Sequence, residues 1–84
     1  MREREIVIGL ETGLEARPIA LLVQVASQFE SDIYIESGNK RVNAKSIMGM
    51  MSLGLDNGET VRVSTAGEDE DKAMNEIEKF LKAE

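Results

Sequence analysis

Two short segments of the chain hold the side chains that could take part in chemistry, and the first surrounds Glu15. Here Glu15 and Arg17 stand at the start of an apolar, helix-like stretch. The first N–H groups of a helix are unpaired and its dipole is positive at that end, so anions bind there. Glu15, Ala16 and Arg17 are therefore a candidate anion site, in which the Arg17 guanidinium suits phosphate or carboxylate. The simpler interpretation is that Glu15 caps the helix and pairs with Arg17 on the surface.

The second segment begins at Ser46, which precedes a short apolar stretch and stands where a helix N-cap belongs. A phosphate on its hydroxyl would be stabilised by the helix dipole and could pair with the neighbouring Lys45. Ser46 is therefore a candidate phosphorylation site. The alternative is an ordinary capping serine, whose hydroxyl accepts a backbone hydrogen bond and has no further role.

The apolar stretch after Ser46 has more hydrophobic side chains than one helix face can bury. A helix on a sheet buries a single stripe, so Met50 and Leu53 are expected to point inward. Three side chains then remain partly exposed: Ile47, Met48 and Met51. Because methionine adapts to the shape of a partner, this surface is predicted to bind another protein unless loops cover it.

The same region is basic within an acidic chain. Ten Lys and Arg against 16 Asp and Glu give a net charge of −6 over 84 residues. No acidic residue lies between Glu36 and Asp56, and that interval holds three basic ones: Lys40, Arg41 and Lys45. The overall charge argues against nucleic-acid binding, which requires clustered positive charge. The local charge predicts a basic, methionine-rich projection suited to a protein partner.

What the chain lacks excludes most kinds of catalysis. It contains neither cysteine nor histidine, which excludes disulfides, thiolate zinc sites, cysteine nucleophiles and histidine bases. No glycine-rich phosphate cradle is present. The acidic run 68–71 fits a solvated helix N-terminus better than a calcium site. We therefore expect no enzyme activity and no metal, cofactor or small-molecule substrate. No apolar run approaches the ~20 residues of a membrane span, so a cytoplasmic protein that does not contact membranes is expected.

The hydrophobic pattern predicts one α+β domain over residues 1–84 with the order β-α-β-β-α-β-α. Strands are expected at 6–10, 32–36, 40–43 and 61–64, and helices at 16–29, 46–53 and 68–82. The first helix is expected to bury one apolar stripe: Ile19, Leu22, Val23 and Ala26, widened by Leu21, Val25 and Phe29. Because each strand has one polar face, the sheet should be antiparallel or mixed, with its helices on one face.

Both candidate segments resemble those of HPr, the small phosphocarrier of the bacterial sugar phosphotransferase system, and the similarity spans essentially the whole chain. HPr proteins carry Gly-(Ile/Leu)-His-Ala-Arg-Pro, where this chain has Gly13-Leu14-Glu15-Ala16-Arg17-Pro18. Their regulatory-serine segment is similar to residues 43–53, with Ser46 in the place of that serine. The resemblance implies an HPr-like open-faced β-sandwich, in which three helices cover one face of a four-stranded antiparallel sheet.

The resemblance also places Glu15 at the family's phosphohistidine position, where a carboxylate replaces the imidazole that carries phosphate. The Crh (catabolite-repression HPr) branch likewise lacks this histidine, commonly carrying glutamine, and keeps the serine. The sequence is most similar to that branch. This implies that HPr kinase/phosphorylase phosphorylates Ser46, and that the product is corepressor of a LacI-type catabolite control repressor.

The resemblance further implies a docking face for that repressor: Arg17, Ala20, Lys45, Ile47, Met48 and Met51. The alternative function within the family is a phosphocarrier HPr. Such a protein would work through Glu15, or would be an HPr whose active histidine had been replaced by Glu15. Binding of nucleic acid, membrane or a small-molecule substrate is not implied by either function.

Overall fold

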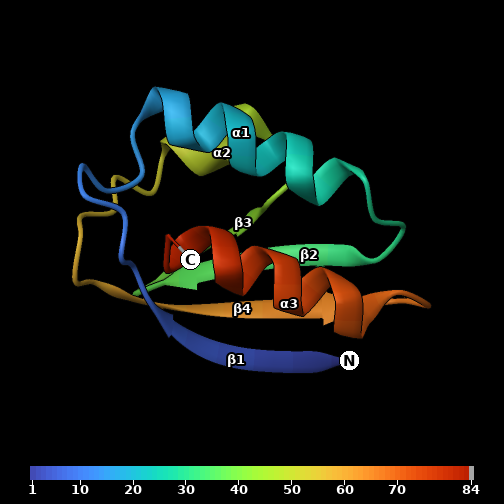
Figure 1. The fold of residues 1–84 in the computed structure, drawn as a ribbon. Helices are drawn as coiled ribbons and strands as arrows, with labels where there is room; N and C mark the ends of the chain where they lie inside the picture. Colours follow the sequence, from blue (N-terminus) through green and yellow to red (C-terminus); the bar gives the residue numbers. More distant parts are fainter. Residues whose placement is uncertain (84) are drawn as a thin grey trace.

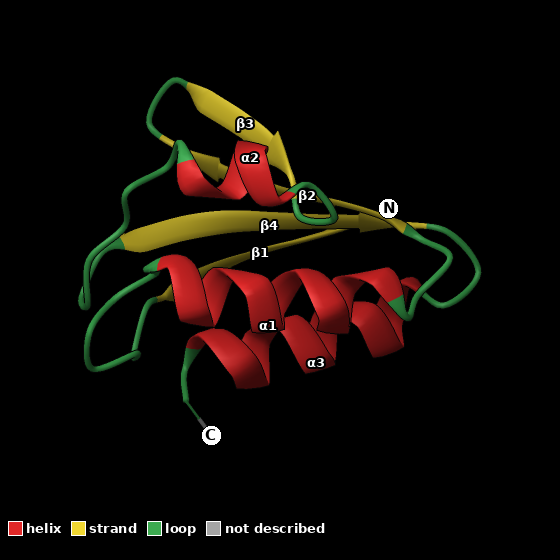
Figure 2. Ribbon diagram, turned by 90° about the horizontal axis from the view of Figure 1, so that it is seen from above, coloured by secondary structure: helices red, strands yellow, loops and turns green. Residues whose placement is uncertain are grey.

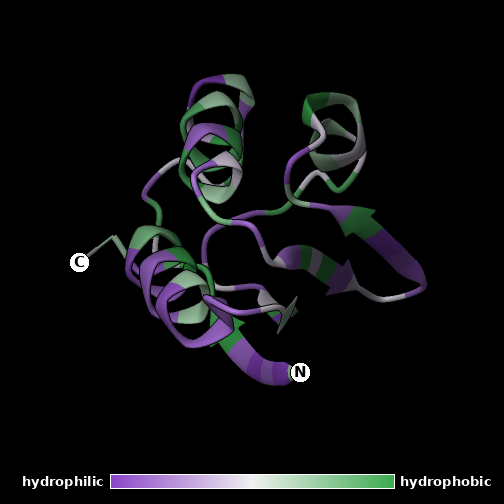
Figure 3. Cartoon of the chain, turned by 90° about the vertical axis from the view of Figure 1, so that its right-hand side faces the viewer, coloured by the Kyte–Doolittle hydropathy of each residue, from purple (hydrophilic) through white to green (hydrophobic). Residues whose placement is uncertain are grey.

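The computed structural model describes residues 1–83 and has the predicted order β-α-β-β-α-β-α (Figure 1). The strands are β1 (Arg2–Val7), β2 (Asp32–Ser37), β3 (Lys40–Asn43) and β4 (Thr60–Ala66). The helices are α1 (Ala16–Ser27), α2 (Ile47–Met51) and α3 (Glu70–Leu81). The strands form one sheet in the order β1-β4-β2-β3, with every neighbouring pair antiparallel. The helices lie on one face of this sheet (Figure 3), so the predicted open-faced α+β arrangement is confirmed.

The core lies between the sheet and the helices. Period-two alternation turns Ile33 and Ile35 of β2 and Val61 and Val63 of β4 toward the helices, where all four are buried. Helix α3 covers β1 and β4, α2 lies beside β3, and α1 packs between α2 and α3 (Figure 2). The helices therefore form a layer in which α1 and α2 share a boundary, and this boundary is where the two candidate segments lie.

Strand β1 begins earlier than the sequence predicts. A strand was expected at 6–10, but β1 spans Arg2–Val7, because pairing with β4 extends through the charged N-terminal residues. Arg2 and Arg4 lie on the helix side of the sheet and form ion pairs with Asp71 and Glu78 of α3. Alternation of apolar residues cannot reveal residues 2–5 as part of this strand, because their side chains are charged and exposed and their backbone pairs with the distant β4.

The N-terminus of α3 is tied to the loop before β2 through Asp69. Asp69 is the N-cap residue of α3 but makes no capping hydrogen bond with its side chain. Its carboxylate instead accepts hydrogen bonds from the backbone N–H groups of Glu30 (2.9 Å) and Ser31 (3.0 Å) and from the Ser31 hydroxyl. Gly67 permits this approach, because its φ is 154° and a Cβ there would lie 2.6 Å from the Ser31 Oγ. The acidic run 68–71 was expected to be only a solvated helix N-terminus, but Asp69 within it holds the loop before β2 in place.

The stability of the fold should decrease in acid because of these carboxylates. The Ser31 hydroxyl, with backbone N–H groups, lowers the pKa of Asp69 below its ordinary value of 3.8. The Gly67 N–H lowers the pKa of Glu70 below 4.5 in the same way. Groups whose pKa is lowered by folding stabilise the protein above the unfolded value, and that stabilisation is lost as pH falls through the folded value. The free energy of unfolding should therefore fall below about pH 4.5.

Urea denaturation between pH 7 and pH 3 measures this dependence. The variant Asp69→Asn should lose stability at pH 7 and show a shallower decline in acid, since it no longer gains or loses a proton. Glu68→Gln, one residue away and exposed, is the control and should follow the parent protein. Parallel pH curves for Asp69→Asn and the parent would contradict the assignment.

Candidate functional site

Ser46 caps α2, as the sequence predicts. Its backbone is extended, with φ −109° and ψ 114°, and its Oγ accepts a hydrogen bond of 3.1 Å from the Gly49 N–H. The lack of a side chain at Gly49 matters here, because a Cβ would lie only 3.3 Å from that Oγ. The Ser46 hydroxyl is therefore half-buried and held at the start of α2 by a backbone N–H.

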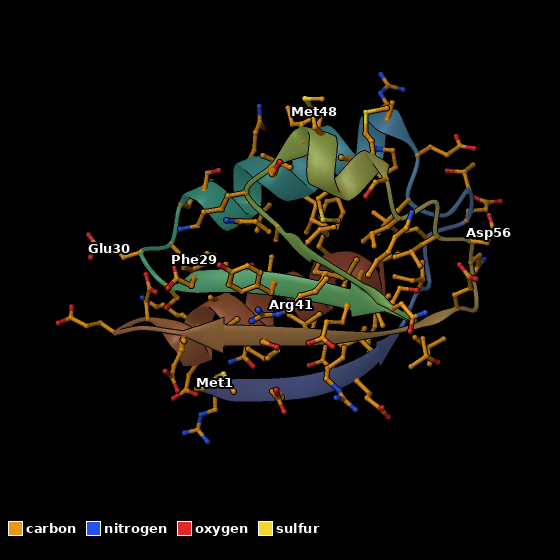
Figure 4. The ribbon with its side chains drawn as sticks, turned by 180° about the vertical axis from the view of Figure 1, so that it is seen from behind. Met1, Phe29, Glu30, Arg41, Met48 and Asp56 are labelled. Carbon is orange, nitrogen blue, oxygen red and sulfur yellow. The ribbon has the colours of Figure 1, made fainter. Side chains whose placement is uncertain are left out.

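Helix α2 exposes the three apolar side chains that were expected to be exposed. Met48 is 85% exposed, Met51 54% and Ile47 50%, whereas Met50 is completely buried. We call Ile47, Met48 and Met51 the α2 surface. Met48 points away from the sheet (Figure 4), and within residues 1–83 no loop covers it. Leu53 packs against the core but remains partly exposed.

The α2 surface is not what holds α2 in place. Met50 anchors the helix in the core, and the Ser46 cap fixes its start. At its end, the Ser52 hydroxyl donates to the Gly49 carbonyl (2.6 Å) and the Lys40 ammonium donates to the Ser52 carbonyl (2.8 Å). Because these contacts lie on the inner side and at the two ends, the outward side chains remain free to contact a partner.

The predicted basic projection is wrong in its details. Lys40 faces α2, but Arg41 is on the opposite face of the sheet, where it pairs with Glu36 (3.6 Å) and stacks over the Tyr34 ring (4.0 Å). Adjacent strand residues point to opposite faces, so Lys40 and Arg41 cannot form one patch. The Lys45 ammonium donates to the Phe29 carbonyl (2.7 Å) rather than facing the Ser46 hydroxyl.

The start of α1 also differs from the expected capping arrangement. Glu15 is the N-cap residue, and its backbone carbonyl accepts from the Ile19 N–H (2.9 Å), but its side chain makes no capping hydrogen bond. Nor do Glu15 and Arg17 form the predicted ion pair, since no oxygen and nitrogen of the two approach within 4 Å. Glu15, Ala16 and Arg17 are all exposed. The candidate anion site is thus an open helix end with a carboxylate beside it.

Because Glu15 is exposed and makes no side-chain bond, Glu15→Gln should barely change stability. We expect the free energy of unfolding to shift by no more than about 0.5 kcal/mol, the range of ordinary surface substitutions. Thermal and urea denaturation of both proteins at pH 7 measure this shift. A loss of several kcal/mol would show that the carboxylate has a structural role.

The two candidate segments lie at opposite ends of a pair of antiparallel helices. Before α1, the Leu14 N–H donates to the Leu55 carbonyl beyond α2 (2.8 Å). Gly13 allows this contact, because its φ is 74° and a Cβ would lie 2.6 Å from the same oxygen. At the other end, Lys45 reaches Phe29 beyond α1. Glu15 and Ser46 therefore do not form one site, although α1 and α2 pack side by side.

Helix α1 contributes exposed residues to this pair of helices. Arg17 and Ala20, predicted to belong to the docking face, are both exposed. Leu21 was expected to widen the buried stripe, but it is 49% exposed. Counting about 100° per residue places Leu21 about 200° around α1 from the buried Ile19, so a stricter use of helical periodicity would have found it. The apolar surface of α1 is thus larger than predicted.

Metal sites, hollows and membrane-spanning helices are the other features of the described part of the chain that could indicate a function. Across residues 1–83 there is no group of three or more Asp and Glu side chains arranged to hold a metal ion. A hollow on the open side of the sheet includes no candidate residue and is lined by Glu5, Glu36, Gly38, Thr60, Val61 and Arg62. Every helix within these residues falls short of the length and apolar character that a membrane span requires.

Known proteins resemble this chain along its whole length. Residues 2–83 match the family model described as PTS HPr component phosphorylation site. The chain belongs to the HPr family. It is 49% identical over 84 residues to HPr-like protein Crh of Halalkalibacterium halodurans, covering 100% of both proteins. It is 44% identical over 84 residues to HPr-like protein Crh of Bacillus subtilis, covering 100% of this chain and 99% of that one.

Solved structures of the HPr family share the fold. HPr-C-His from Thermoanaerobacter tengcongensis gives a TM-score of 0.93 at 49% identity, covering 99% of this chain and 93% of that one. Crh of Bacillus subtilis, described as a dimer with a swapped domain, gives 0.81 at 44% identity, covering 100% and 97%. The predicted resemblance to HPr and its Crh branch is confirmed, and proteins of this family are phosphocarriers or regulators.

Proposed function

We propose that this HPr family protein is a cytoplasmic, Crh-like regulator switched by phosphorylation of Ser46. HPr kinase/phosphorylase transfers phosphate from ATP to the Ser46 hydroxyl, and the phosphoprotein then acts as corepressor of a LacI-type catabolite control repressor. The observation that carries this proposal is the position of Ser46, a capping serine at the edge of an exposed apolar helix surface. A phosphate there would add charge beside a surface that is already suited to binding.

The α1 segment supports a regulator rather than a carrier. Glu15 stands at the position of the family's phosphohistidine, and a carboxylate lacks the ring nitrogen that accepts and releases phosphate. Its side chain is exposed and unbonded within residues 1–83, so nothing there prepares it as a nucleophile. The Crh proteins of Halalkalibacterium halodurans and Bacillus subtilis, at 49% and 44% identity, support the same function.

The repressor would contact the α2 surface together with exposed residues of α1. Ile47, Met48 and Met51 supply apolar area, and Arg17 and Ala20 extend the face along α1. Burying such area drives association, while the phosphate supplies charge-assisted hydrogen bonds. Lys45 would join this face only if its ammonium left the Phe29 carbonyl, so its contribution to docking should be smaller than that of the methionines.

Mass spectrometry tests the phosphorylation directly. Incubation with HPr kinase/phosphorylase and ATP should add one phosphate at Ser46, and Ser46→Ala should remain unmodified. Ser52→Ala is the matched control, since Ser52 lies at the other end of α2, and should accept phosphate like the parent. Phosphate on Ser52 or Ser64 instead would contradict the proposal. Enzyme I with phosphoenolpyruvate should leave the mass unchanged, and an adduct on Glu15 would show a phosphocarrier.

A further inference from the structure

The five methionines of the chain differ sharply in their exposure to solvent. Met50 and Met74 are 0% and 1% exposed and belong to the core, whereas Met48 and Met51 are 85% and 54% exposed on the α2 surface. Met1 is also exposed, at 73%, but it lies on the opposite side of the molecule from Met48 (Figure 4). An oxidant dissolved in water therefore has access to the two methionines of the α2 surface and to the remote Met1, but not to the two core methionines.

We propose that Met48, and more slowly Met51, is a site of reversible oxidation that turns off binding at the α2 surface. This inference rests on the proposed function, because it assigns a second control to the same docking face. The co-reactant is hydrogen peroxide. The thioether sulfur attacks one peroxide oxygen, the O–O bond breaks and an S–O bond forms, while the proton on the transferred oxygen passes to the departing hydroxide, which leaves as water. The sulfur loses two electrons and the peroxide gains them, giving methionine sulfoxide, which methionine sulfoxide reductases return to the thioether.

The fold should tolerate this oxidation. The contacts that hold α2 are the buried Met50, the Ser46 cap and the hydrogen bond from Lys40 to the Ser52 carbonyl. None of them involves the sulfur of Met48 or Met51. Oxidation of a core methionine would disrupt packing, but Met50 and Met74 are shielded for as long as the protein stays folded. The modification is therefore confined to the surface and leaves the rest of the molecule unchanged.

Binding, by contrast, should be sensitive to it. Met48 has the most exposed large apolar side chain of residues 1–83 and so has the most area to bury in a complex. A sulfoxide replaces the apolar sulfur with a strong hydrogen-bond acceptor, and burying that oxygen without a partner is costly. We expect oxidation to weaken repressor binding by about tenfold or more. Ser46 phosphorylation would then turn the surface on, and methionine oxidation would turn it off.

The test oxidises the whole protein with dilute hydrogen peroxide and follows each methionine by peptide mass mapping. Met1 and Met48 should gain oxygen first, Met51 next, and Met50 and Met74 only once the protein is unfolded in urea. Circular dichroism should show no loss of structure at the stage when Met48 is oxidised. Equal rates for Met48, Met50 and Met74 in the folded protein would overturn the assignment, whatever the binding partner is.

The second stage titrates the repressor with Ser46-phosphorylated protein before oxidation, after oxidation and after treatment with sulfoxide reductases. Affinity should fall on oxidation and return on reduction. The control is the double variant Met48→Leu/Met51→Leu, whose affinity is measured before and after the same oxidation. The two affinities should be equal, because Met1 is the one accessible methionine that this variant keeps within the described residues. Equal affinities of the oxidised and reduced parent would overturn the inference and leave the proposed function standing. If the reduced phosphoprotein does not bind at all, both are overturned.

Discussion

Phosphorylated on Ser46, the protein should bind the catabolite control repressor roughly tenfold to over a hundredfold more tightly than the unmodified chain. A hydrogen bond to a charged group contributes about 1.5–3 kcal/mol, and each 1.4 kcal/mol is a factor of ten in affinity. Within this chain, the Lys45 ammonium is bonded to the Phe29 carbonyl and Arg41 is on the other face of the sheet. The phosphate is therefore available to a basic residue of the partner.

Titration of the repressor with phosphorylated and unmodified protein, by calorimetry or fluorescence, measures this difference. Ser46→Asp is a useful comparison and should imitate phosphoserine poorly. A carboxylate has one charge and two oxygens, where a phosphate has nearly two charges and three oxygens. Ser46→Ala should bind like the unmodified chain. A modification changes binding only through what it contributes in the complex, so equal affinities of the two forms would refute the corepressor function.

The fold was predictable from the sequence where burial alone decides the structure. Strand β2 follows from the alternation of buried Ile33 and Ile35 with less buried neighbours. The helix beginning at Ala16 follows from the spacing of three to four residues between its buried side chains. The early start of β1 was not predictable, since Arg2 and Arg4 are held by carboxylates of α3 that lie far along the chain. The hydrogen bonds between Asp69 and the loop before β2 were not predictable either, because they too join residues far apart in the sequence.

The exposure of the candidate side chains was predictable from the sequence, but the bonding partners of the charged groups were not. The exposed positions of Ile47, Met48 and Met51 follow from an apolar helix that can bury only one stripe. The predicted pairs, Glu15 with Arg17 and phosphate with Lys45, rested on nearness in the sequence. A long side chain can bond to any acceptor that the fold places within its reach. The Lys45 ammonium bonds to the Phe29 carbonyl, and this contact could not be predicted without knowing how α1 and α2 pack together.

Placing a charge at the centre of the α2 surface should have a comparably large effect. Met48→Asp should weaken repressor binding by at least about 2 kcal/mol, or roughly thirtyfold, even when Ser46 is phosphorylated. The carboxylate would have to lose its water in an apolar interface with no partner to compensate it. The fold should be unaffected, because Met48 is 85% exposed and α2 is anchored by Met50.

The matched control for this variant is Val7→Asp. Val7 is 53% exposed, and since Ile6 points into the core, Val7 points to the open side of the sheet, away from α2. Val7→Asp replaces an exposed apolar residue with the same charged one, so it changes the net charge by the same amount as Met48→Asp. Repressor binding by this control should stay close to that of the parent. Both variants should also accept phosphate on Ser46, which separates loss of docking from loss of modification. If phosphorylated Met48→Asp binds as tightly as the parent, the repressor does not use the α2 surface, and the docking face must be sought elsewhere.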